Sequence, residues 1–195
     1  RRYAKSATIL KRLVHLVGQH SSAHAARALE PICLCSRGPA ACVAAGLLSA
    51  VTSCLLGQVK IAARTGLYDV DTTMLQLLQH CCNGSATLQT KQVYESVQCV
   101  CKVLDVFIST YSASTPTIRN LPRGFQKKNS IQNDEALQLC HVSCQCLSNI
   151  SQLPGSFDAF DLFLQTGALD ALCTILRNRG YGSSDASSVC ARTLT

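Results

Sequence analysis

Tryptophan is absent from this chain of 195 residues, and aromatic residues of all kinds make up only 5% of it. All-β sandwiches and barrels normally contain more aromatic and β-branched side chains, so this scarcity argues against them. Prolines number only five, and three of them (Pro116, Pro122 and Pro154) lie in stretches that have the composition of loops. The apolar residues are mainly Ala, Leu, Val and Cys, and small side chains with Leu at helical spacing favour closely packed helices.

Long apolar runs are also missing, because polar residues interrupt every stretch well before the roughly 18 residues that a membrane-spanning helix needs. We therefore expect no membrane span. Charged residues make up 15% of the chain and hydrophobic residues 47%, which is too apolar a composition for a disordered protein. The length is enough for one ordinary core or for a few repeats of a helical solenoid.

The motifs of common enzyme families are missing as well. The chain contains no Gly-x-Ser-x-Gly elbow, no Gly-x-x-x-x-Gly-Lys phosphate loop and no Gly-x-Gly-x-x-Gly nucleotide fingerprint. Asp and Glu together number 11, and no two of them are placed for acid–base catalysis. We therefore expect no catalytic residue, no metal and no cofactor, and a protein that is not an enzyme.

Cysteine, by contrast, is abundant, with 13 copies. An odd count does not fit a complete disulfide framework, and a free cysteine behaves as a small apolar side chain. We therefore expect a reducing intracellular compartment, either the cytoplasm or the mitochondrion, and burial of the cysteines that lie at helical spacing. Those cysteines are Cys33, Cys54, Cys99, Cys140, Cys144 and Cys173.

One group of residues leaves a zinc site as an alternative. Cys140, His141, Cys144 and Cys146 lie close together on one expected helix, and thiolate and imidazole are zinc ligands. A structural zinc site usually takes its ligands from two elements, so this one would need a second pair of cysteines from another helix. Burial as small core residues is the simpler interpretation.

Apolar residues recur every three or four positions over most of the chain, which predicts a series of helices. Gly18 is expected to end the first helix, and Ser21 or Ser22 to begin the second. Later helices are expected at about 40–56, 72–82, 88–111, 134–151, 156–165, 167–178 and after Ser183. Residues 112–132 break the pattern and predict an exposed loop of about twenty residues.

An internal repeat links two distant parts of the chain. Residues 43–51 resemble residues 164–172, and alignment of Gly46 with Gly167 brings several leucines and a valine into register. The offset of 121 residues is close to three units of about 40 residues. Each segment follows a longer apolar helix that ends at a Gly or Pro turn, so the pattern indicates a helical repeat protein.

The second of these two segments, together with the helix before it, carries a more specific pattern. Residues 136–151, which end in Leu147-Ser148-Asn149-Ile150-Ser151, together with residues 163–172 around Gly167, resemble an armadillo repeat. In that family a third helix ends in a pattern such as Leu-Ser-Asn-Leu-Ser, and the next repeat opens with a short helix, a glycine and a leucine-rich helix. The resemblance is good over residues 134–178 and weaker over 22–56, and related HEAT repeats share it.

The resemblance implies an all-α fold, a right-handed α-solenoid of armadillo-like repeats. We expect degenerate repeats in residues 1–111, a basic loop with Pro and Gly in 112–132, and repeats that are truncated at the C-terminus in 133–195. Many armadillo proteins line their groove with asparagines on the third helix of each repeat. Asn149 lies near the end of such a helix, but this chain has no regular series of such asparagines. Because armadillo proteins bind partners along their surface, the resemblance implies a non-catalytic protein–protein interaction scaffold, a structural subunit of a larger multiprotein assembly, in which neighbouring repeats or subunits cap both ends.

Charge is unevenly distributed in this chain, whose net charge is +7. Residues 1–37 contain seven Lys and Arg against one Glu, whereas residues 129–176 contain five acidic residues and no Lys or Arg. Basic segments can neutralise phosphates, so the alternative function is that of an RNA-contacting structural component of a ribonucleoprotein such as an organellar (mitochondrial) ribosome. The residues expected to contact a partner or RNA are Lys11, Arg12, Arg119, Arg123, Lys127 and Lys128.

Overall fold

The computed structural model describes residues 2–65, 70–83, 88–114, 123–153, 158–177 and 184–193. Every regular element within these ranges is an α-helix, which confirms the all-α class expected from the sequence. None of the helices described is, by itself, long and apolar enough to cross a membrane.

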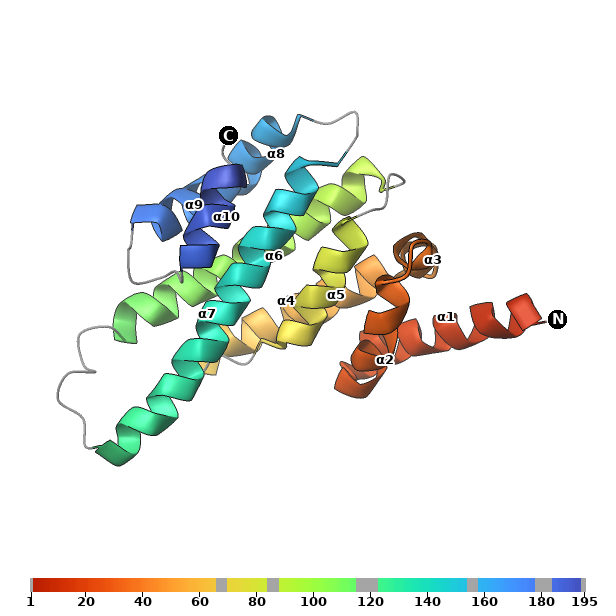
Figure 1. Cartoon of the computed structure of the whole chain (residues 1–195), viewed down its shortest axis with the longest axis horizontal. Coiled ribbons are helices and arrows are strands. Elements are labelled where there is room, and N and C mark those ends of the chain that lie inside the picture. Colours follow the sequence, from red (N-terminus) through yellow and green to blue (C-terminus); the bar gives the residue numbers. More distant parts are fainter. Residues whose placement is uncertain are drawn as a thin grey trace.

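The main helices form two rows, one in front of the other (Figure 1). The front row consists of α2 (Ala23–Cys33), α5 (Thr72–Cys82), α7 (Arg123–Ser151) and α10 (Ser184–Thr193). The back row consists of α1 (Arg2–His20), α4 (Leu47–Thr65), α6 (Thr90–Ser114) and α9 (Ala168–Arg177). Each helix packs on the next helix of its own row, and α1–α2, α4–α5, α6–α7 and α9–α10 join the rows. The core therefore runs along the molecule between two layers.

Two short helices complete the described part of the chain, and each leads into a helix of the back row. Helix α3 (Gly38–Ala44) precedes α4, and α8 (Ala159–Thr166) precedes α9. The glycine at each junction has a left-handed backbone, with φ of 90° at Gly46 and 77° at Gly167. The two helix pairs bend by 74° and 80°. The two glycines that the sequence repeat aligned therefore make the same kind of turn.

Short polar side chains begin several of these helices. The Ser22 hydroxyl accepts a hydrogen bond from the backbone N–H of Ala25 at 3.3 Å, and the Asp71 carboxylate accepts one from the N–H of Thr73 at 2.8 Å. Each side chain satisfies a backbone donor that has no partner within the first turn of its helix. Ser22 is one of the two residues that the sequence predicted at the start of the second helix.

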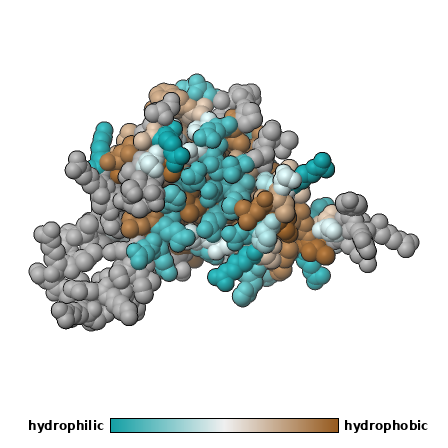
Figure 2. Space-filling model, in the orientation of Figure 1, coloured by the Kyte–Doolittle hydropathy of each residue, from teal (hydrophilic) through white to brown (hydrophobic). Residues whose placement is uncertain are grey.

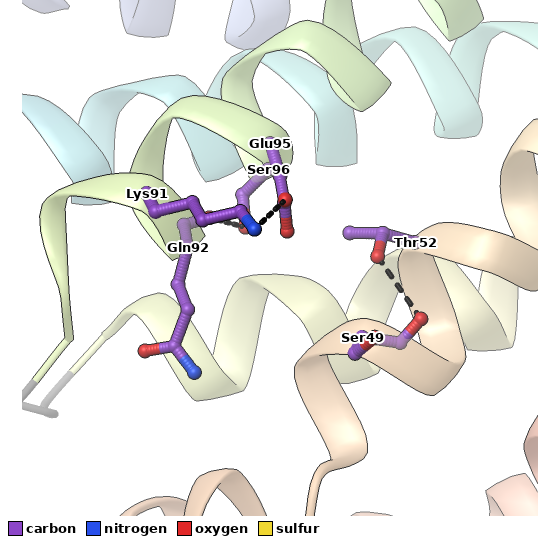
Figure 3. Close-up of polar contacts among 6 residues, drawn as sticks. All are labelled: Ser49, Thr52, Lys91, Gln92, Glu95 and Ser96. Carbon is purple, nitrogen blue, oxygen red and sulfur yellow. Dashed lines mark hydrogen bonds and ion pairs between the residues drawn. The ribbon is translucent and has the colours of Figure 1, made fainter.

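The interface between α4 and α6 shows how polar residues enter the core. Thr52 and Ser96 are buried, and each hydroxyl donates to a carbonyl of its own helix (Figure 3). Thr52 reaches the carbonyl oxygens of Leu48 and Ser49 at 2.9 and 3.1 Å, and Ser96 reaches that of Gln92 at 2.8 Å. Because no hydroxyl proton is left unpaired here, the two helices pack without a penalty for buried polar groups.

The structure corrects three expectations about helix boundaries. Helix α1 does not end at Gly18, because that glycine lies inside the helix, where a Cβ would be 3.2 Å from the Ala50 side chain of α4. The single helix expected over 40–56 is divided at Gly46, and its second part continues through Gly57 to Thr65. The spacing of apolar residues indicates that a stretch is helical, but it does not show where one helix ends and the next begins in a new direction.

The loop expected over residues 112–132 is wrong for most of its length. Residues 112–114 end α6 and residues 123–132 form the first part of α7, whereas 115–122 lie outside the described residues. The segment 123–132 is polar, and its glutamines and lysines are good helix formers that carry no apolar period. The polar composition of this segment therefore suggested a loop, although the helix propensity of its residues permits a helix.

Candidate interaction surface

The front row presents a broad polar surface made of α2, α5, α7 and α10. Figure 2 shows mostly hydrophilic side chains over the middle of this face, with hydrophobic patches on its left side and toward the right-hand end, where α1 and α2 lie. The front row therefore offers a mainly polar surface over its middle.

An amide network links α5 and α7. Asn149 is 8% exposed, and its Nδ2 donates to the backbone carbonyl of Gln79 at 3.4 Å. The Nε2 of Gln145, one turn earlier on α7, donates to Oδ1 of Asn149 at 3.1 Å. The Gln79 carbonyl also accepts from the N–H of Asn83 at 3.0 Å, so Asn149 joins α7 to the last turn of α5. This hydrogen bond holds the amide of the half-buried Gln145 against Asn149.

Sequence reasoning singled out Asn149 but missed Gln145 and Gln79. His141, Gln145 and Asn149 lie at successive spacings of four on α7, so they share one face of the helix. Nδ1 of His141 is buried and has no hydrogen-bond partner among the residues that the structure describes. Three larger polar residues at this spacing, in a segment that is otherwise apolar except for two serines, are the signal that was available in the sequence. Gln79, 70 residues away from Asn149, is found only in the fold.

The residues of the alternative zinc site point to different neighbours. Sγ of Cys190 on α10 donates to Sγ of Cys144 at 3.3 Å, and the free thiol of Cys146 is hydrogen-bonded to that of Cys82 on α5. In the described part of the chain, no group of three or more His, Cys, Asp or Glu side chains is arranged to hold a metal ion. The helix thus distributes these sulfurs among several packing contacts.

The cysteines serve mainly as core residues. All those expected to be buried are buried except Cys173, which is half-buried, and Cys35 is exposed. Burial raises the pKa of Cys99 to about 12 and that of Cys101 to about 11, because the thiolate loses its hydration. These two thiols therefore stay protonated near neutral pH and are poor nucleophiles.

The expected contact residues do not form one patch. Lys11 and Arg12 are exposed on α1, at the right-hand end of Figure 1, and neither forms an ion pair with a residue that the structure describes. Arg123, Lys127 and Lys128 lie on the first two turns of α7, at the lower left of the same view. Arg119 lies outside the described residues. The two basic segments that the sequence suggested therefore lie at different ends of the molecule.

Comparison of the chain with protein-family models, with curated proteins and with solved structures finds no match.

Proposed function

We propose that this chain is a non-catalytic interaction scaffold, a right-handed α-solenoid of armadillo-like repeats that acts as a structural subunit of a multiprotein assembly. Support for the solenoid comes from the two rows, in which each helix packs on the next one along its row. Further support comes from the equivalent left-handed turns at Gly46 and Gly167. The free cysteines fit a reducing compartment, and we propose the cytoplasm or the mitochondrion.

The observation that carries the proposed function is the continuous front row with its amide network. A partner chain lying across α5 and α7 would meet Gln145, which is half-buried and already held by Asn149. A pre-oriented amide can donate to and accept from a peptide backbone with little further loss of side-chain entropy. His141, one turn away, is the second contact that we propose.

Partner capture with matched variants tests this function. We would purify the tagged chain from cells with and without ribonuclease and identify the proteins that accompany it. Gln145→Ala should lose the protein partners, whereas Gln98→Ala, which removes an exposed glutamine from α6 of the back row, should retain them. Circular dichroism of both variants checks that the fold is intact. Equal retention of partners by both variants would contradict the proposed role of the front row.

The charge of the chain favours a second candidate, an RNA-contacting component of a ribonucleoprotein. The net charge is +7, and Lys11 and Arg12 are exposed without ion-pair partners in the described part of the chain. RNA binding through such residues should weaken steeply as salt rises, and Arg12→Glu should reduce that dependence. Loss of all companions on ribonuclease treatment would favour this candidate over the protein scaffold.

A further inference from the structure

Helix α1 carries an apolar and basic face that the described chain covers only in part. Ile9 is 60% exposed and Leu16 is 36% exposed, and these residues lie two turns apart on one side of the helix. Arg12 lies on the same side, one turn before Leu16, and is also exposed. The opposite side of α1 is occupied, because Val14 and Val17 are buried where α1 packs on α2 and α4. We name the exposed set Ile9, Arg12 and Leu16 the α1 patch.

Helix α8 carries a similar face of opposite charge. Phe160 is 62% exposed and Leu164 is 61% exposed, one helical turn apart. Asp161 is exposed on the same side, three residues before Leu164, and Asp158 is exposed at the N-cap. The other side of α8 packs on α6, α7 and α9 and includes the buried residues Leu162 and Phe163. We name the exposed set Phe160, Asp161 and Leu164 the α8 patch.

The two patches match each other in chemistry but lie far apart in one molecule. Each consists of two large apolar side chains beside one charged side chain, and the charges are opposite. Helix α1 forms the right-hand end of the molecule, whereas α8 lies at the top of its left half (Figure 1). The surrounding sequence strengthens the contrast, since residues 1–37 are basic and residues 129–176 contain no Lys or Arg. A single copy cannot bring its own α1 patch onto its own α8 patch without leaving this fold.

We propose that a second copy of this chain covers the α1 patch with its α8 patch. Ile9 and Leu16 would pack against Phe160 and Leu164, and Arg12 would pair with Asp161. Exposed apolar residues that cluster on one helix face indicate an interaction site more strongly than isolated ones do. The contact joins two different surfaces, so a pair of copies keeps one free α1 patch and one free α8 patch, and further copies add head to tail. This inference goes beyond the proposed function, because the front row takes no part in it.

Two variants that each block one patch test the proposal. Ile9→Ala with Leu16→Ala disables the α1 patch, and Phe160→Ala with Leu164→Ala disables the α8 patch. In light scattering and sedimentation, the unmodified chain should associate with rising concentration up to roughly 100 μM, and each variant should associate at least about tenfold more weakly. Raising salt from about 50 to 500 mM should also weaken association, because the charges of Arg12 and Asp161 are screened.

A mixture of the two variants gives the sharpest result. Each variant retains the patch that the other lacks, so an equal mixture should form a 1:1 dimer and nothing larger. Formation of that dimer also shows that both variants are folded. As a control, Ile61→Ala removes a side chain that is 56% exposed on α4 and should leave association unchanged.

Charge exchange is the second, independent measurement. Arg12→Glu and Asp161→Lys should each weaken association, and the chain that carries both changes should recover it. An unmodified chain that stays monomeric at low salt overturns the proposal. Association that survives both alanine variants overturns it as well, and so does a mixture that yields no 1:1 dimer. None of these outcomes bears on partner capture by Gln145, so this proposal and the proposed function succeed or fail separately.

Discussion

The α3–α4 pair and the α8–α9 pair both turn through a glycine in the left-handed conformation, but their short helices begin differently. Asp158 caps α8 by accepting hydrogen bonds from the N–H groups of Phe160 and Asp161 at 2.8 and 3.4 Å. Helix α3 has no side-chain cap at Arg37, and its first residue, Gly38, lies against the backbone of Ile32 on α2. The same bend can therefore follow a short helix that begins with a polar cap, as in the α8–α9 pair, or one that begins with close backbone packing, as in the α3–α4 pair.

The substitution with the largest expected effect disrupts the packing at the start of α3, in the α3–α4 pair. In Gly38→Ala, the new Cβ would overlap the carbonyl oxygen of Ile32 and lie 2.7 Å from its carbonyl carbon. Since both atoms are backbone, α2 and α3 must separate, and we expect a loss of about 3 kcal/mol in the free energy of unfolding. Urea denaturation followed by circular dichroism measures it.

A second glycine provides the control for that substitution. Gly57 lies inside α4, and a Cβ built there meets nothing within 4 Å. Gly57→Ala should therefore raise the free energy of unfolding by about 0.5–1 kcal/mol, because alanine is the better helix former. Equal losses for Gly38→Ala and Gly57→Ala would mean that the contact with Ile32 does not hold α3 in place.

The second prediction concerns the feature that the two pairs share. Gly46→Ala and Gly167→Ala should each lower the free energy of unfolding by about 1–2 kcal/mol, because an L side chain disfavours left-handed backbone. A Cβ at either position meets nothing within 4 Å, so the loss reflects conformation alone. Asn tolerates this conformation better, so Gly46→Asn and Gly167→Asn should lose less than the alanine variants. A large difference between the two alanine variants would argue against equivalent turns.

The third prediction separates the two ways of starting the short helix. Asp158→Ala should lower the free energy of unfolding by about 1 kcal/mol, because two N–H groups of α8 lose their acceptor. Asp158→Asn keeps an acceptor oxygen and should lose less. Arg37→Ala at the start of α3 should stay within about 0.5 kcal/mol of the unmodified chain, since Arg37 forms no side-chain cap. A comparable loss at Arg37 would remove the distinction between the two pairs.

These pairs also show what the sequence could and could not predict. Helix α5 was predicted with its correct bounds because its signals are local: an Asp71 cap, an apolar period and a turn at Asn83. The spacing of apolar residues did not predict the turn at Gly46, but the internal repeat indicated it. The repeat aligns Gly46 with Gly167, and both glycines have a left-handed backbone. The start of α7 was missed because its first residues are polar and the packing that places this helix involves distant parts of the chain.

The candidate site was predictable to a smaller degree. The repeat motif includes Asn149 but did not predict it as a contact residue, because the chain has no regular series of such asparagines. Its acceptor is a backbone carbonyl 70 residues away, which no local pattern encodes. The exposure of Phe160 and Leu164 was equally hidden, because the apolar period of α8 does not say which of its apolar residues face the core. Patterns of residue type locate helices, whereas the surfaces that helices leave uncovered depend on how the rows pack.

The substitution with the smallest expected effect gives α8 a proline in its first turn, as α3 has. Helix α3 has Pro39 in its first turn, and Ala159 holds the first helical position of α8. Asp158, which precedes Ala159, has φ of −79° and ψ of 114°, an extended conformation that a following proline favours. Ala159→Pro should therefore raise the free energy of unfolding by about 0.5 kcal/mol, because proline reduces the freedom of the unfolded chain. Phe160→Pro, one position later, removes the N–H that bonds to Asp158 and should be destabilising in the same urea measurement. If both prolines were tolerated equally, the Asp158 cap would not be what begins α8, and the contrast between the two pairs would have to lie elsewhere.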